Sequence, residues 1–206
     1  LKSGVISIGA SETALHSLLL PVLGAFHRAY PGIRLRISNH STPQAIGALK
    51  DGSADIAVVT TPTVHTASLV ETVVRPITEV AVCSPYFKEL GDKQTSLSEL
   101  INFPLISLGK DTKSFEFYSA LFAAHGLPYK PDIEAFTADQ ILPMVAADLG
   151  IGFVPEEFLR EGDGICRIKL EEKIPKRSIV IIKRKEQPLS VAAKELERMI
   201  RECGNQ

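Results

Sequence analysis

The segment that most constrains the fold is residues 49–62, Leu-Lys-Asp-Gly-Ser-Ala-Asp-Ile-Ala-Val-Val-Thr-Thr-Pro. The Asp-Gly pair at 51–52 is typical of a turn that ends a helix, because glycine adopts the positive φ needed there. Residues 56–59 form an unbroken apolar run, typical of a strand covered on both faces in a parallel α/β sheet. The run ends at Thr60 and Thr61, and ligands of open α/β sheets bind beyond the carboxyl ends of strands. The segment therefore predicts an α/β fold and one wall of a binding site.

The residues before this segment predict two further strands and two helices. Residues 5–10 predict a strand, and residues 11–30 predict a helix with apolar side chains at i, i+3 and i+4. Pro21 lies inside that helix and cannot donate to the carbonyl four residues earlier, which predicts a bend. Residues 33–38 alternate apolar and polar, as in a strand near a sheet edge. With a helix at 42–50, the order is β-α-β-α-β, the unit of a doubly wound sheet.

Two extended segments predict a second lobe. Residues 69–75 and 77–84 have the composition of strands and are separated by Pro76, and residues 178–183 predict a strand long enough to return to the first lobe. Because no long linker is present, we expect two crossings that form a hinge over a cleft, as in periplasmic binding proteins. The predicted lobes are residues 1–74 with 179–206 (lobe I) and residues 75–178 (lobe II).

The composition argues against several classes of function. The chain has 206 residues, of which 45% are apolar and 23% charged, as in ordinary globular proteins. Its net charge of −1 argues against nucleic-acid binding by this chain alone, because binding to phosphates needs a basic excess. No window approaches the ~20 apolar residues of a membrane span. The chain starts at Leu1 without a leader, so we expect a fragment of a longer protein.

No residue pattern predicts catalysis, a cofactor or a metal. The five histidines are scattered, and none is paired with Ser or Cys in a motif such as G-x-S-x-G, although distant residues can also assemble a triad. Gly150-Ile-Gly152 precedes a strand, which is the wrong context for a nucleotide-binding loop. Cys83, Cys166 and Cys203 are widely spaced and belong to no Cys/His cluster. This spacing predicts free thiols in a reducing cytosol rather than a zinc site.

Four motifs together resemble one known family. They are Gly4-Val-Ile-Ser-Ile-Gly9, Leu20-Pro21…Phe26-His-Arg-Ala-Tyr30-Pro31-Gly, Asp51-Gly-x-x-Asp55-Ile-Ala-Val and Val145-Ala-Ala-Asp-Leu-Gly-Ile-Gly-Phe-Val-Pro155. They span nearly the whole chain. The motifs and their order resemble those of the effector-binding domain of LysR-type transcriptional regulators. The resemblance implies a two-lobed, periplasmic-binding-protein-like (type 2) fold. Each lobe would be a mixed, mostly parallel sheet flanked by helices, and two crossover strands would join the lobes.

The candidate ligand site consists of polar residues at strand ends and helix starts. Helix starts present unpaired N–H groups and a positive dipole end, which suit a carboxylate or another anion. The alternative is that the hydroxyls only cap their helices. Glu12 would either repel an anion or bind a cationic group, while Lys110 and Lys113 either offset its charge or are merely solvated. The resemblance implies a small-molecule effector bound by the loop after the first strand, by Thr60 or Thr61 and by loops of the second lobe. The candidate residues are Ser11, Glu12, Thr13, Thr60, Thr61, Ser107, Thr112, Phe136 and Thr137, with Phe136 and Phe153 as either apolar wall or core.

Two helices carry apolar side chains over more than one face. They contain Leu20 and Leu23 in one case, and Phe115 and Phe122 in the other. Each is either enclosed within the fold or a surface for self-association. The resemblance implies that the two helices pair head to tail across the two-fold axis of a homodimer.

Three functions follow in order of support. The first is the ligand-sensing domain of a cytoplasmic LysR-type regulator, in which DNA is contacted only by a winged helix-turn-helix domain missing from this chain. The second is an extracytoplasmic solute-binding protein, which would carry a leader or lipid anchor and act as a monomer. The third is an enzyme, for which the sequence offers neither a general base nor a cofactor anchor. Fold analogy alone does not separate the three.

Overall fold

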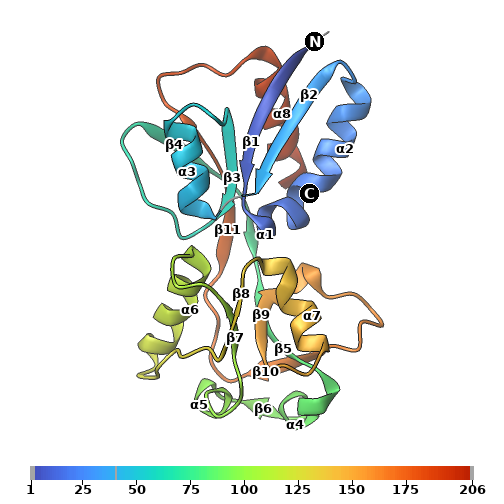
Figure 1. Ribbon diagram of the computed structural model, residues 1–206, viewed down its shortest axis with the longest axis vertical. Helices are drawn as coiled ribbons and strands as arrows, with labels where there is room; N and C mark the ends of the chain where they lie inside the picture. Colours follow the sequence, from blue (N-terminus) through green and yellow to red (C-terminus); the bar gives the residue numbers. More distant parts are fainter. Residues whose placement is uncertain (1–2, 40, 205–206) are drawn as a thin grey trace. The chain divides into compact units, whose positions relative to one another are not determined.

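The computed structural model describes residues 3–39 and 41–204, and the chain divides into two compact units (Figure 1). Unit 1 comprises Leu1–Pro76 with Ser178–Gln206, and unit 2 comprises Ile77–Arg177. The chain therefore passes from one unit to the other at two places, after Pro76 and after Arg177. In each unit, helices pack on β-sheet structure.

Unit 1 contains a five-stranded sheet in the order β2-β1-β3-β11-β4. Strand β1 pairs with β2 and β3 in parallel, and β11 pairs with β3 antiparallel, so the sheet is mixed. The edge position of β2 confirms the prediction from its alternating sequence. All five residues of β3 are buried, as its apolar composition predicts. The strands are β1 Gly4–Ala10, β2 Ile33–Asn39, β3 Ile56–Thr60, β4 Leu69–Ile77 and β11 Arg177–Arg184.

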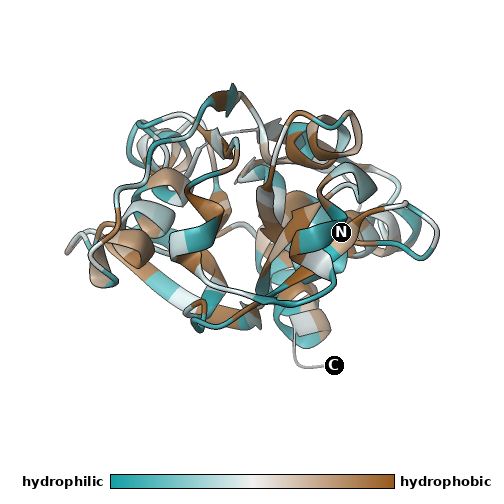
Figure 2. Cartoon of the chain, turned by 90° about the horizontal axis from the view of Figure 1, so that it is seen from below, coloured by the Kyte–Doolittle hydropathy of each residue, from teal (hydrophilic) through white to brown (hydrophobic). Residues whose placement is uncertain are grey.

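The helices of unit 1 cover this sheet, with α3 packed on β1 and β3, and α2 packed against α8. Figure 2 shows apolar residues on both the strands and the helices, and the buried cluster between α3 and the sheet includes Leu49, Val59 and Val180. Gly52, with φ of 83°, ends the turn after α3 as predicted. The helical segments are α1 Glu12–Ala14, the π-helix η1 Leu15–Leu19, α2 Leu20–Ala29, α3 Thr42–Lys50 and α8 Val191–Gly204.

The helix predicted for residues 11–30 changes type immediately before Pro21. The segment η1 is π-helical, and the N–H of Leu20 donates to the carbonyl of Leu15, five residues earlier. Because Pro21 has no N–H, the carbonyl of Ser17 lacks its usual partner within the helix. The guanidinium of Arg75 donates to that carbonyl instead. A π-helical turn, stabilised by a side chain from β4, therefore precedes the proline.

Unit 2 contains a four-stranded sheet in the order β6-β10-β5-β9 and a separate parallel pair, β7 and β8. In the larger sheet, β5 runs antiparallel to both β9 and β10, and only β6 and β10 are parallel. The sheets are mixed as predicted, and in this larger sheet two of the three strand pairs are antiparallel. The strands are β5 Glu79–Cys83, β6 Gln94–Thr95, β7 Ile106–Leu108, β8 Ile133–Ala135, β9 Gly152–Pro155 and β10 Cys166–Leu170.

The break between β4 and β5 lies at a different residue from the one predicted. Strand β4 continues through Pro76, and the break falls at Thr78 instead. Proline is tolerated there because β4 is the edge strand of its sheet. After Thr137 the chain forms a 3₁₀ turn, η3, followed by a short α7. The helical segments of unit 2 are η2 Pro85–Phe87, α4 Lys88–Gly91, α5 Leu97–Leu100, α6 Lys113–Ala124, η3 Ala138–Gln140, α7 Ile141–Ala146 and η4 Glu156–Phe158.

Candidate functional site

The first group of predicted site residues lies at the carboxyl end of β1 in unit 1. The register pairs Ala10 of β1 with Val58 of β3, so these parallel strands end at the same edge of the sheet. The N–H of Ser11 donates to the carbonyl of Val58 at 3.1 Å. The hydroxyl of Ser11 accepts from the N–H of Ala14 at 3.3 Å, which confirms that Ser11 caps the helix. Ser11 and Thr13 are both buried, so this helix start is built into the sheet edge.

A second helix starts at the same edge. Thr60 is the last residue of β3 and is 3% exposed. The hydroxyl of Thr42, in the first turn of α3, donates to the carbonyl of Thr60 at 3.2 Å. The N-termini of α1 and α3 therefore both lie against the end of β3, and we refer to this region as the unit 1 edge. The sequence analysis recognised Thr42 only as a helix start, because the hydrogen bond to Thr60 depends on tertiary packing.

Thr61 and Glu12 already have partners within unit 1. The N–H of Thr61 donates to the carbonyl of Ser178 at 2.9 Å, and the N–H of Ser178 donates to the Thr61 hydroxyl at 2.9 Å. Thr61 therefore ties the end of β3 to β11. The carboxylate of Glu12 lies 2.7 Å from Nε2 of His16, one turn along the helix. A protonated His16 would offset the charge of Glu12, which weakens the objection to an anion at this edge.

The predicted site residues of unit 2 follow a second pair of parallel strands. Ser107 of β7 is paired with Glu134 of β8, so the residues after these strands share one edge. Thr112 caps α6 by accepting from the N–H of Phe115 at 3.1 Å. Thr137 precedes η3, and its hydroxyl lies 2.5 Å from the carboxylate of Asp139. We refer to this region as the unit 2 edge.

Ser107 is the buried member of the unit 2 edge. It is 4% exposed. Burial raises the pKa of the neighbouring Tyr129 to about 12, and a hydrogen bond with the Ser107 hydroxyl opposes that shift. Ser107 is therefore a buried hydroxyl of this edge with Tyr129 as its neighbour.

Phe136, Lys110 and Lys113 at this edge differ in solvent exposure and in ion pairing. Phe136 is 90% exposed, so the core alternative is wrong for Phe136, whereas Phe153 is 4% exposed and belongs to the core. Lys110 is exposed, and Lys113 forms an ion pair with Glu116. Phe136 is therefore an exposed aromatic ring beside the polar residues, and Lys113 is ion-paired within α6.

The family model described as LysR substrate binding domain matches residues 1–204. The chain belongs to this family. It is 28% identical to the uncharacterized HTH-type transcriptional regulator YwbI of Bacillus subtilis over 94% of this chain and 64% of that protein. It is 23% identical to the regulator AlsR of the same organism over 75% of this chain and 51% of AlsR. The chain thus spans only part of the curated relatives that it matches.

Solved structures show the same fold at low sequence identity. The regulatory domain of Synechocystis CcmR in complex with 2-PG superposes with a TM-score of 0.87 at 17% identity and 99% coverage of both chains. The effector binding domain of QuiR in complex with shikimate has a TM-score of 0.83 at 16% identity and covers 99% of this chain and 98% of that one. These likenesses confirm the predicted type 2 periplasmic-binding-protein-like fold of this LysR-type domain.

The sequence analysis did not identify a buried polar cluster of this LysR-type domain. Arg177 donates to Glu79 at 3.0 Å, and the hydroxyl of Tyr118 donates to the second oxygen of Glu79 at 2.8 Å. The side chains of Arg177 and Glu79 are only 3% and 1% exposed, and Arg177 also lies over the ring of Phe117 at 5.0 Å. Burial, followed by the charge of Glu79, raises the pKa of Tyr118 well above its ordinary value. The available signal was a glutamate at the start of an otherwise apolar strand, residues 79–83.

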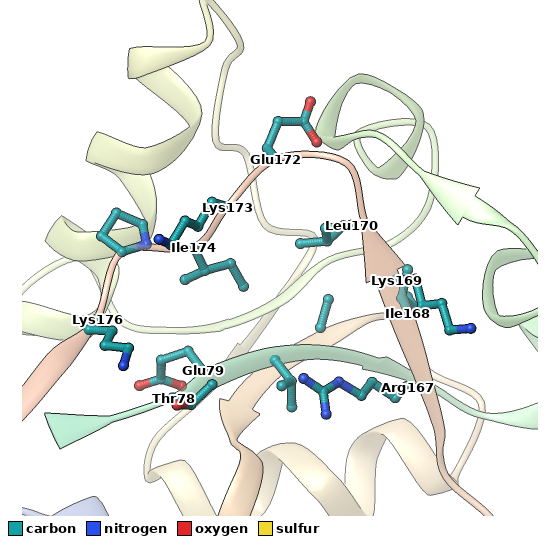
Figure 3. Close-up of a pocket in the computed structure, with 13 residues that line it drawn as sticks. Thr78, Glu79, Arg167, Ile168, Lys169, Leu170, Glu172, Lys173, Ile174 and Lys176 are labelled. Carbon is teal, nitrogen blue, oxygen red and sulfur yellow. The ribbon is translucent and has the colours of Figure 1, made fainter.

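Unit 2 of this LysR-type domain also contains a cavity of about 580 Å³ that none of the predicted site residues lines. Its wall includes β5, β10 and residues 172–176, and Figure 3 shows Lys176 and Glu79 on the same side of it. The cavity is lined by Thr78, Glu79, Val80, Ala81, Arg167, Ile168, Lys169, Leu170, Glu172, Lys173, Ile174, Pro175 and Lys176. Within the described ranges there is no cluster of three or more side chains suited to bind a metal, and no helix long and apolar enough to cross a membrane.

Proposed function

We propose that this chain is the ligand-sensing domain of a LysR-type transcriptional regulator and that the unit 1 edge binds an anionic group of the ligand. The observation that carries the proposal is the meeting of two helix N-termini, those of α1 and α3, at the end of β3. Unpaired N–H groups and the positive dipole ends of helices favour a carboxylate or phosphate there. Ser11, Thr13 and Thr60 supply the neighbouring hydroxyl groups.

The relatives support the chemistry of this assignment. QuiR is described with shikimate, which carries a carboxylate, and CcmR with 2-PG. The ion pair of Glu12 with His16 removes a carboxylate from direct competition with such a ligand when the imidazole is protonated. At the unit 2 edge, the buried hydroxyl of Ser107 is a further candidate contact, while Thr112, Phe136 and Thr137 stay proposals without a specific supporting contact. The predicted cleft between the lobes also stays a prediction.

The activity of the whole protein is inferred from the regulators to which this chain is similar. YwbI and AlsR are named HTH-type transcriptional regulators, and this chain spans 64% and 51% of their lengths. We infer that DNA is contacted by a segment outside this chain, that the protein is cytoplasmic and that this domain is not an enzyme. These inferences rest on membership of the family, which favours a regulator over a transport protein.

A homodimer through the two apolar helices is also part of the proposal. Leu23 and Phe122, which belong to these two helices, are 7% and 0% exposed and lie in the core. Leu20 is 48% exposed and Phe115 is half-buried. The proposed pairing of α2 with α6 of a second copy therefore uses the Leu20 and Phe115 faces of these helices.

The ligand proposal is tested by a thermal-shift screen against carboxylates, amino acids and inorganic anions. A ligand at ~100 times its dissociation constant adds about 2.7 kcal/mol to the free energy of unfolding, which raises the melting temperature by roughly 5 to 11 °C for a chain of this size. For any hit, Kd is then measured by calorimetry for Ser11→Ala and Thr60→Val. We expect both variants to weaken binding about tenfold or more, because each loses a contact worth about 1.4 kcal/mol.

Ser96→Ala is the matched control for Ser11→Ala. Ser96 caps α5 by accepting from the N–H of Glu99 at 3.3 Å, the same geometry as at Ser11. Both variants should lose about 1 kcal/mol of stability, but only Ser11→Ala should change Kd. Ser107→Ala tests the unit 2 edge separately, with its melting temperature measured alongside Kd. A ligand bound equally well by the Ser11 and Thr60 variants would show that the unit 1 edge is not the site.

A further inference from the structure

Two of the three cysteines lie opposite each other in unit 2. Strands β5 and β10 are antiparallel, and their register pairs Cys166 directly with Cys83. Side chains of directly opposed residues point to the same face of a sheet, about 4.5–5.5 Å apart at Cβ. Cys83 belongs to a buried core cluster, and Cys166 packs against that same cluster. The two thiols are therefore neighbours on one face, although 82 residues separate them in the sequence.

This placement suits a disulfide. Directly opposed residues of an antiparallel pair have Cα atoms about 4.5 or 5.5 Å apart, and disulfides span roughly 4.4–6.8 Å between Cα atoms. Both cysteines are free in this structure. We propose that Cys83 and Cys166 are a redox-active dithiol, which a hydroperoxide converts into an intramolecular disulfide within unit 2. The site is separate from the unit 1 edge and does not depend on the proposed function.

The surroundings assign different roles to the two thiols. Cys83 is fully buried, and its thiol donates to the carbonyl of Phe87 at 3.6 Å. Burial, with smaller contributions from Cys166 and Glu89, raises the pKa of Cys83 to about 12. Cys83 is therefore protonated at neutral pH and, because it is buried, shielded from an oxidant in solution, so it reacts only with a group placed beside it. Cys166 is partly exposed, so Cys166 is the thiol that an oxidant in solution can reach.

The proposed chemistry has two steps. The thiolate of Cys166 attacks one oxygen of hydrogen peroxide, the O–O bond breaks, and the leaving hydroxide takes up a proton as water; Cys166 becomes a sulfenic acid. The sulfur of Cys83 then displaces the hydroxyl of that sulfenic acid, and the proton of the Cys83 thiol leaves with it as a second water. In total, two thiols and one peroxide give one disulfide and two waters.

The disulfide would connect the two strands that contribute to the wall of the unit 2 cavity. Residues 79–81 of β5 and 167–170 of β10 line that cavity (Figure 3). In the reduced protein, β10 pairs with β5 at its first three residues, and Ile168 of β10 packs in the same buried cluster as Ala81 of β5. A covalent link at Cys166 would prevent β10 from separating from β5 when the sheet opens locally.

The experiment treats the reduced 206-residue chain with a few equivalents of hydrogen peroxide and counts free thiols. We expect the count to fall from three to one, with a mass decrease of about two hydrogens and a tryptic link between the peptides of Cys83 and Cys166. Dithiothreitol should restore all three thiols. Cys203 lies in α8 of unit 1, so Cys203→Ser serves as the control and should form the same link.

Two variants separate the roles of the thiols. Cys83→Ser removes the resolving thiol, so a sulfenic acid should accumulate at Cys166 and react with a dimedone-type probe. Cys166→Ser removes the attacking thiol, so Cys83 should stay reduced. Circular dichroism before oxidation identifies a variant that fails to fold. The proposal is overturned if wild-type Cys166 proceeds to sulfinic acid while Cys83 stays free, or if the only disulfide formed involves Cys203.

Discussion

The buried cluster of Arg177, Glu79 and Tyr118 predicts a large stability effect from a single substitution. Arg177→Met keeps most of the apolar stem of the side chain but removes its charge. Glu79, whose side chain is 1% exposed, would then retain its hydrogen bond from Tyr118 but lose its charged partner among the described residues. Removal of one partner from a buried ion pair typically costs about 3–5 kcal/mol, because the other charge is left uncompensated. We expect a loss of this size in the free energy of unfolding.

Urea unfolding measures this loss, and the chain offers a convenient probe. It contains no tryptophan and four tyrosines, of which Tyr86, Tyr118 and Tyr129 lie in unit 2. Near-UV circular dichroism therefore reports mainly on the unit that contains the cluster, while the far-UV signal reports on both units. Arg167→Met is the control, because Arg167 forms an exposed ion pair with Glu156 and such pairs contribute about 0–1 kcal/mol.

A triple variant tests the physical reason. Replacement of a whole buried charge cluster by apolar residues of similar volume is often neutral or stabilising. The variant Arg177→Met, Glu79→Leu, Tyr118→Phe should therefore recover most of the stability that Arg177→Met loses. Our reasoning would be refuted if Arg177→Met cost less than about 1 kcal/mol, the range of an exposed pair. It would also fail if the triple variant were no more stable than the single one.

Two further predictions concern alkaline pH and glycine substitutions. Because the pKa of Tyr129 rises from 10.0 to about 12 on folding, its contribution to stability is complete below pH 10 and is lost as the pH rises to about 12. The wild type should lose roughly 2–3 kcal/mol more than Tyr129→Phe between urea titrations at pH 9 and pH 12. Gly47→Ala, in α3 with no atom within 4 Å of the added Cβ, should stabilise by about 0.5–1 kcal/mol. Gly150→Ala would bring the added Cβ into a clash with the carbonyl oxygen of Pro104 and should lower the free energy of unfolding by about 1–3 kcal/mol or more. Equal melting temperatures for the Gly47 and Gly150 variants would contradict the packing argument.

Local patterns predicted the elements of unit 1 well because each depends on neighbours in sequence. The Asp-Gly pair at 51–52 ends α3, Ser11 caps the first helix, and the apolar run at 56–59 becomes a fully buried strand. Capping, turn formation and apolar periodicity all act over a few residues, so a single sequence is enough to recognise them. The same reasoning placed β2 at a sheet edge from its alternation.

Features that depend on distant segments could not be predicted in this way. The short elements η2, α4 and β6 lie within residues 85–95, where no periodic pattern is long enough to be recognised. The opposition of Cys83 and Cys166 depends on the register of β5 with β10, and that register forms only when unit 2 folds. The cluster of Arg177 with Glu79 likewise joins residues that are 98 positions apart. A glutamate in an apolar strand showed that a partner was needed, but not which residue would supply it.

The hydrogen bonds at the unit 1 edge divide its hydroxyl groups into two kinds. The hydroxyl of Thr42 holds α3 to Thr60, and the hydroxyl of Thr61 accepts from Ser178 of β11, so both have structural partners. The hydroxyl of Ser11 accepts a capping hydrogen bond, yet its own proton can still be donated, since a serine hydroxyl is both donor and acceptor. We infer that Thr61 belongs to the framework that fixes the end of β3, and that Ser11 is the hydroxyl best suited to contact an anion. A ligand at this edge would then meet a donor whose position is already set by the helix cap, so little conformational entropy would be lost on binding.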